Sequence, residues 1–190
     1  MKNTLLLILL VSLVYSQEKS DYSNKFDQFI SSNAGTINSF EYYPIAHSLK
    51  GGGLGFKAAF DIQIIKAKIG SAEDIFIHFY YSDEYSWHEA YIDYKDFSDI
   101  TKAMNELIKD YNRDKTTTDA MRQGNYKIKN EFVSSDNKFR VGYGNRLPKN
   151  KYDLKWNMRI DRHSVEIDLV KLGTLLNTIA FKIDDLTDGR

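Results

Sequence analysis

The chain has 190 residues, 42% of them hydrophobic and 14% aromatic, which supports one packed domain and excludes an intrinsically disordered protein. Its 26 Lys and Arg balance 26 Asp and Glu, so a globally basic nucleic-acid binder is not expected. The absence of cysteine excludes disulfides, cysteine nucleophiles and a lipid-anchored lipoprotein.

Residues 1–16 are predicted to be a secretory signal peptide. Lys2 precedes an apolar run at 5–14, and small residues stand near a cleavage point before Gln17. Ten helical residues rise only about 15 Å, short of the roughly 30 Å core of a bilayer, so a membrane anchor is disfavoured. The mature chain is therefore expected in a periplasm or outside the cell, with no membrane span.

Charge is distributed unevenly along the chain. Residues 73–110 hold ten Asp and Glu against three Lys, a net charge of −7, whereas residues 122–162 hold eleven Lys and Arg against four Asp and Glu, a net charge of +7. The two segments either neutralise each other within one domain or offer a basic surface to an anionic partner.

Residues 17–38 are expected to form a helical lead. Phe26, Phe29 and Ile30 recur at the spacing of one helix face, and residues 31–35 then break the pattern. The lead is thus predicted to bury one apolar side.

Four strands are predicted in the next part of the chain. Pro44 is expected to end the first, and a glycine-rich turn at 50–55 leads into a long second strand. Two runs rich in aromatic and β-branched residues, separated by a five-residue turn, predict an antiparallel hairpin. The four strands are expected at 39–45, 56–70, 75–81 and 87–94.

Apolar residues spaced by three and four predict a helix over 99–114, capped by Asp96 or Ser98. The polar segment 115–124 is predicted to be a connector. The order then restarts in the second half of the chain, with strands expected at 126–133, 138–144, 153–160 and 164–170 and a helix at 172–186.

The restart predicts a duplicated unit. Aligning Ile92-Asp93 with Ile167-Asp168 also superimposes the apolar positions of the two predicted helices, for example Met104 on Ile179. We therefore predict an α+β protein, with one domain at 39–190 built of two ββββα-like halves, 39–114 and 125–190.

This order resembles the Whirly fold of single-stranded DNA-binding proteins over roughly residues 39–186. "GFKAAF" at 55–60 is similar to the "KGKAAL" stretch of plant Whirly proteins, with Lys57, Ala58 and Ala59 in common, and the C-terminal strand and helix have a similar shape. The resemblance implies a Whirly-like fold, single-stranded DNA as a partner and a homo-oligomer. Members of that family act inside organelles, whereas the predicted signal peptide implies export.

One face of the predicted hairpin is a candidate binding surface. If Tyr81 lies opposite His88, the isoleucines of both strands enter the core and the other face is aromatic with interspersed carboxylates. Such a face can stack flat rings, be covered by another part of the protein, or simply stabilise the sheet. Its residues are Phe76, His78, Tyr80, Trp87, Glu89, Tyr91 and Asp93.

Phosphates would instead favour basic residues of the second half as an anion-binding set. These are Lys127, Lys129, Lys138, Arg140, Lys155 and Arg159.

Motifs for catalysis are weak. His78, Glu89 and Asp93 suggest at most an acid/base pair, and no metal-ligand spacing, serine elbow or phosphate loop accompanies them. We therefore expect an exported, cofactor-free, metal-free and non-catalytic module that binds a protein, glycan or envelope component. A single-stranded nucleic-acid binder and an enzyme using His78, Glu89 and Asp93 remain alternatives.

Overall fold

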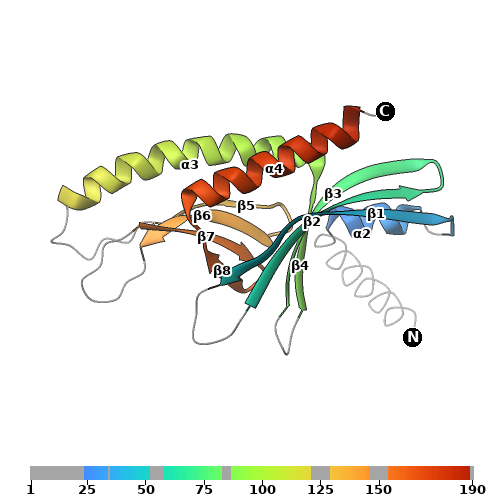
Figure 1. The fold of residues 1–190 in the computed structure, drawn as a ribbon, viewed down its shortest axis with the longest axis horizontal. Helices are drawn as coiled ribbons and strands as arrows, with labels where there is room; N and C mark the ends of the chain where they lie inside the picture. The colour runs from blue at the N-terminus through green and yellow to red at the C-terminus, as the bar shows by residue number, and fades with distance from the viewer. Residues whose placement is uncertain are drawn as a thin grey trace, which may run out of the picture.

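The computed structural model describes residues 24–33, 35–51, 58–82, 87–120, 129–145 and 154–188. These residues form two four-stranded antiparallel sheets, each followed by a long helix, with a short helix before the first sheet (Figure 1). The predicted α+β class with two ββββα halves is confirmed. The elements are α2 (Lys25–Ser32), β1 (Asn38–Gly51), β2 (Ala58–Ile69), β3 (Ala72–Ser82), β4 (Trp87–Asp93), α3 (Tyr94–Ala120), β5 (Lys129–Val133), β6 (Phe139–Asn145), β7 (Leu154–Ile160), β8 (His163–Glu166) and α4 (Leu169–Asp188).

Several predicted features lie outside the described residues. They are the signal peptide at 1–16, residues 17–23 of the helical lead, residues 52–55 of the glycine-rich turn, the part of the hexapeptide at 55–57, residues 83–86 of the hairpin turn, residues 121–124 of the connector, and the start of the predicted strand at 126–128 with Lys127. No helix in the described part of the chain combines the length and the apolar character needed to span a membrane.

Both sheets are meanders, with the strand orders β1-β2-β3-β4 and β5-β6-β7-β8. The helices α3 and α4 lie side by side along one side of the molecule (Figure 1). The inner faces of both sheets and the apolar sides of both helices share one hydrophobic core. Within it, Phe79 of β3 packs on Phe139 of β6, with ring centroids 4.5 Å apart. Each half thus buries its apolar surface against the other.

The repeated Ile-Asp pair has the same structural role in both halves. Ile92 and Ile167 are buried at the ends of their sheets. The next residue caps the helix that follows: the Asp93 carboxylate accepts a hydrogen bond from the Lys95 backbone N–H, and the Asp168 carboxylate accepts one from the Val170 N–H. Carboxylates at this position satisfy N–H groups that have no partner within the helix.

Both long helices begin earlier than predicted, because these aspartates cap them. The predicted caps Asp96 and Ser98 lie inside α3, and the end of the predicted strand 164–170 belongs to α4. α3 also continues through residues 115–120 of the predicted connector, where no glycine or proline interrupts it.

The prediction that Pro44 ends the first strand is wrong. β1 continues through Pro44 to Gly51, with irregularities in its pairing to β2 on either side of Ala46. Proline is tolerated here because β1 lies at the edge of its sheet and, among the described strands, pairs with β2 alone.

The short helix α2 packs on the outer face of the first sheet. Its Phe26 is buried there with Ile65 and Phe76, and Phe29 and Ile30 pack at the margin. The predicted apolar side of the lead helix therefore covers one end of the sheet face that the hairpin was predicted to expose.

In the second sheet, the backbones of β5 and β6 approach each other closely at Gly142. A Cβ added at this residue would lie 2.1 Å from the backbone oxygen of Asn130 and 2.5 Å from the Cα of Glu131 on β5. Only glycine allows β5 to approach β6 this closely.

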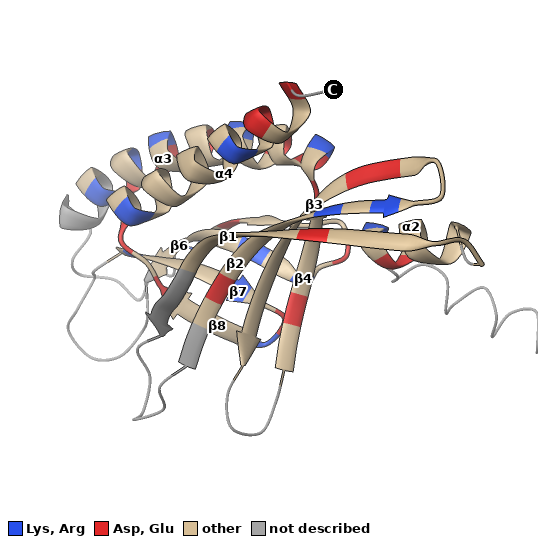
Figure 2. Cartoon of the chain, turned by 45° about the vertical axis from the view of Figure 1, so that its right-hand side comes forward, with Lys and Arg blue, Asp and Glu red and all other residues tan. Residues whose placement is uncertain are grey.

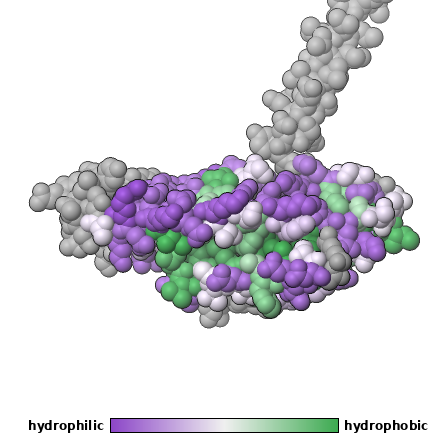
Figure 3. Space-filling view, turned by 90° about the horizontal axis from the view of Figure 1, so that it is seen from above, coloured by the Kyte–Doolittle hydropathy of each residue, from purple (hydrophilic) through white to green (hydrophobic). Residues whose placement is uncertain are grey.

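The surface over the two long helices is mostly hydrophilic, with smaller apolar patches (Figure 3). Lys and Arg are interspersed with Asp and Glu along α3 and α4 (Figure 2). Pairs one helical turn apart, such as Asp99 with Lys102 and Lys182 with Asp185, explain this pattern as ordinary solvated helix surface.

Candidate functional site

The hairpin of β3 and β4 has the predicted register. Tyr81 lies opposite His88, and His78 lies opposite Tyr91. Ile77, Phe79 and Ile92 therefore enter the shared core, while the predicted aromatic residues point to the other face of the sheet.

On that face, five rings stack in a continuous row, which we call the aromatic stack. Neighbouring ring centroids are 4.4 Å apart for Phe26 and Tyr91, 4.3 Å for Tyr91 and His78, 4.9 Å for His78 and Tyr80, and 5.2 Å for Tyr80 and Trp87. The interplanar angles are between 4° and 25°. Most ring faces are thus occupied by a neighbouring ring.

One carboxylate oxygen holds three members of the stack. Glu89 Oε2 accepts hydrogen bonds from Trp87 Nε1 at 3.2 Å and from the Tyr91 hydroxyl at 3.0 Å, and it lies 3.3 Å from His78 Nε2. Gln63 Nε2 lies 3.0 Å from His78 Nδ1. A neutral imidazole with its proton on Nε2 satisfies both partners.

Burial favours this neutral form. His78 is 5% exposed. Burial lowers the pKa of His78, although the nearby Glu89 opposes the shift. The pKa of Tyr91 is raised by burial and by Glu89.

The stack is closed at one end and open at the other. Phe26 closes the first end because it belongs to the small core under α2. Trp87 forms the other end and is 58% exposed. Within the described residues, the outer face of the Trp87 ring meets no other ring, and the Glu89 carboxylate lies beside it.

Besides His78, two further residues of the predicted face are buried. Phe76 is 1% exposed and lies beneath α2, with its ring 5.1 Å from that of Phe26. Asp93 is 8% exposed and caps α3. The structure thus brings His78 and Glu89 together but gives Asp93 a separate role. Among the described residues, no group of three His, Asp or Glu is arranged to hold a metal ion.

The predicted anion-binding residues that the structure describes lie on the second sheet, except Lys138, which lies on the turn between β5 and β6. Several of them have intramolecular partners. Lys129 and Arg140 both pair with Glu131, at 2.7 Å and 2.8 Å, and Lys155 pairs with Glu166 at 3.1 Å. Arg159 Nε donates to the Asp161 backbone oxygen at 2.6 Å, while Lys138 has no ion pair with a described residue.

The two basic side chains on Glu131 also affect its titration. Burial would raise the pKa of Glu131, but the hydrogen bonds and charges of Lys129 and Arg140 outweigh burial and lower it. Much of this basic surface is therefore neutralised locally, which reduces its attraction for phosphate.

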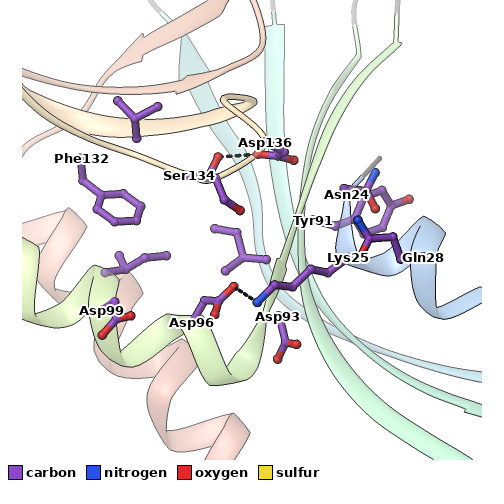
Figure 4. A pocket seen from close by; sticks show the side chains of 14 residues that line it. Asn24, Lys25, Gln28, Tyr91, Asp93, Asp96, Asp99, Phe132, Ser134 and Asp136 are labelled. Carbon is purple, nitrogen blue, oxygen red and sulfur yellow. Dashed lines mark hydrogen bonds and ion pairs between the residues drawn. The ribbon is translucent and has the colours of Figure 1, made fainter. Parts of the chain in front are cut away.

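A cleft of about 560 Å³, which the sequence did not reveal, lies where the two halves meet. Its walls come from α2, the start of α3 and the turn between β5 and β6 (Figure 4). Lys25 reaches from α2 to Asp96, with 2.6 Å between its Nζ and the carboxylate (Figure 4). Tyr91 of β4 lines this cleft and also belongs to the aromatic stack. The helix α2 borders both features, because Lys25 lines the cleft and Phe26 belongs to the stack.

No protein-family model, curated protein or solved structure matches the chain. The resemblance to the Whirly fold stays a prediction that rests on element order and on a hexapeptide only partly within the described residues.

Proposed function

We propose that the protein is an exported, non-catalytic binding module whose ligand is a glycan, held by the open end of the aromatic stack. The observation that carries this proposal is the exposed Trp87 face beside a carboxylate. An aromatic face packs against the C–H face of a sugar ring, and a carboxylate accepts hydrogen bonds from sugar hydroxyls.

The rigidity of the stack supports this proposal. The Trp87 ring is held between Tyr80 and the hydrogen bond to Glu89, so little conformational freedom remains to be lost when a ligand binds. Asp61 lies close enough to raise the pKa of Tyr80, after burial, by its charge and a hydrogen bond, and it adds a second acidic group near this end.

The same charges disfavour nucleic acid as the ligand. Phosphates would be repelled by Glu89 and Asp61, and the basic residues of the second sheet are largely paired with carboxylates. The enzyme alternative has less support still, because His78 lies between two rings and Asp93 does not contact it.

The test is a titration of residues 17–190 with cellohexaose, chitohexaose and the oligonucleotide dT12, each at low and high salt. Tryptophan fluorescence reports on Trp87, since Trp156 is 3% exposed and serves as a buried reference. Trp87→Phe separates the two signals. We expect a saturable, salt-insensitive response to at least one sugar.

Calorimetry on variants then locates the site. Trp87→Ala should abolish sugar binding and Glu89→Gln should weaken it. Phe181→Ala is the matched control, because Phe181 is also exposed, at 75%, but lies on α4. Equal loss in the control, or a salt-dependent response to dT12 with none to the sugars, would contradict the proposal.

A further inference from the structure

The cleft between the halves combines an apolar floor with an acidic rim. Ile92 and Ile100 of the shared core reach it from one half, and Phe132 and Val133 of β5 reach it from the other. Val133 is 40% exposed. The cleft has the size of a typical ligand site and leaves apolar surface uncovered.

Four carboxylates line this cleft against a single lysine. They belong to Asp93, Asp96, Asp99 and Asp136, and the lysine is Lys25. Lys25 pairs with Asp96, and Asp99 pairs with Lys102 outside the cleft at 3.0 Å. Asp93 and Asp136 have no ion pair with any described residue.

The Asp93 carboxylate lines this cleft with few partners of its own. The residue is 8% exposed, and its carboxylate accepts one hydrogen bond, from the Lys95 N–H. Within the described part of the chain, its second oxygen has no hydrogen-bond partner. Burial raises the pKa of Asp93, so its charged form is not fully compensated.

Asp136 adds a second uncompensated charge from the opposite wall. Its Oδ1 accepts hydrogen bonds from the Ser134 hydroxyl and the Lys138 N–H, whereas its Oδ2 is buried and has no partner among the described residues. The dipole of α3 explains carboxylates at Asp93 and Asp96, but Asp136 lies on the turn between β5 and β6, outside that helix.

We infer that this cleft binds a basic segment of a protein partner, with an arginine or lysine stem on Ile100 and Phe132 and its cationic group at Asp93. Long basic side chains bury their methylene groups on apolar surface while the charged end meets a carboxylate. The pairing of an apolar floor with an acidic rim matches that chemistry.

The β5 wall favours a peptide over a small polyamine. Among the described strands, β5 lies at the edge of its sheet and pairs only with β6. Ser134 N donates to Phe139 O across this pair, so the antiparallel alternation turns the backbone groups of Val133 away from β6. An extended peptide can hydrogen-bond to such an edge, and a polyamine has no backbone to do so.

Lys25 occupies part of the place of this cation in the free protein. Its Nζ lies 2.6 Å from Asp96, and both side chains are more than two-fifths exposed. Exposed ion pairs are weak, so an incoming basic side chain can displace Lys25 and take over Asp96. The protein is therefore expected to bind the partner more tightly when Lys25 is removed.

The test uses residues 17–190 and the peptide acetyl-Leu-Arg-Leu-Arg-Leu-amide, followed by calorimetry at low and high salt. The control peptide carries citrulline, which has nearly the shape of arginine without the charge. We expect the arginine peptide to bind in a salt-sensitive way and the citrulline peptide to bind at least about tenfold more weakly.

The cleft variant is Asp93→Asn with Asp136→Asn, and it should weaken arginine-peptide binding about tenfold or more. Asparagine keeps the cap on α3 and the turn hydrogen bonds, and urea unfolding of the variant checks that it is folded. The matched control, Asp110→Asn with Asp185→Asn, removes the same charge outside the cleft and should leave binding within about twofold. Lys25→Met should tighten binding.

Several outcomes would overturn the inference. They are absence of arginine-peptide binding, equal binding of the citrulline peptide, and equal weakening by the two double variants. Spermine is the last competitor: if it binds as tightly as the arginine peptide and displaces it, the ligand is a polyamine and the protein-partner proposal is wrong.

Discussion

Replacing Gly142 by alanine should destabilise the protein strongly, although it adds a single methyl group. The new Cβ would lie 2.1 Å from the Asn130 oxygen, whereas ordinary contact begins at 3.4 Å. β5 would therefore have to move by about 1.3 Å. A backbone hydrogen bond of about 2.9 Å would lengthen to about 4.2 Å and be lost.

The cost follows from these shifts. Two lost ladder hydrogen bonds contribute about 1–3 kcal/mol, and overpacking adds about 1–3 kcal/mol. We expect the free energy of unfolding to fall by about 4 kcal/mol. With a urea dependence of about 2 kcal/mol per molar, the unfolding midpoint falls by about 2 M.

The matched control is Gly173→Ala in α4. A Cβ at Gly173 meets nothing within 4 Å, and alanine is a better helix former than glycine by about 1 kcal/mol. Urea unfolding followed by circular dichroism should therefore give midpoint shifts of opposite sign. If Gly142→Ala unfolds at the midpoint of the parent, β5 does not approach β6 as described.

Three further predictions concern the aromatic stack and the cap of α3. Phe26→Ala should cost about 3 kcal/mol and expose the α2 amides to rapid hydrogen exchange, because Phe26 anchors α2; unchanged protection would contradict that anchoring. His78→Phe should make the free energy of unfolding less dependent on pH. Because the pKa of His78 is lowered in the folded protein, the unfolded parent binds more protons than the folded parent as the pH falls below 6.5. Urea titrations should therefore show that the parent loses more stability than the variant between pH 7.5 and pH 5. Asp93→Asn should be at least as stable as the parent at pH 7, because a raised pKa means that the ionised Asp93 carboxylate destabilises the folded state. This advantage should vanish at pH 3, where the carboxylate is protonated in both the folded and the unfolded states. A variant less stable than the parent at pH 7 would show that the charge itself stabilises the fold.

Local patterns predicted much of this fold. Alternation along residues 75–81 and 87–94 was enough to choose the Tyr81 and His88 register, because any one-residue slip would turn the isoleucines out of the core. The Ile-Asp pairs mark both sheet-to-helix junctions, and the hydrogen bonds that make Asp93 and Asp168 caps are visible only in the structure. The cap at Asp168 explains why Leu169 is the first residue of α4, although the sequence pattern placed it at the end of a strand.

Tertiary contacts could not be predicted in the same way. The apolar side of α2 was visible in Phe26, Phe29 and Ile30, but no periodicity tells which surface such a helix covers. The cleft was missed for the same reason. Asp93 and Asp136 are 43 positions apart, and only the packing of one half on the other brings them to a common space.

The continuation of β1 through Pro44 has a consequence for association between molecules. A long edge strand is a template on which another chain can add a strand, and that reaction leads to aggregation. Pro44 removes one donor from this edge, and the irregular pairing around Ala46 bends the strand away from a flat template. The proline therefore helps to keep separate molecules from joining edge to edge.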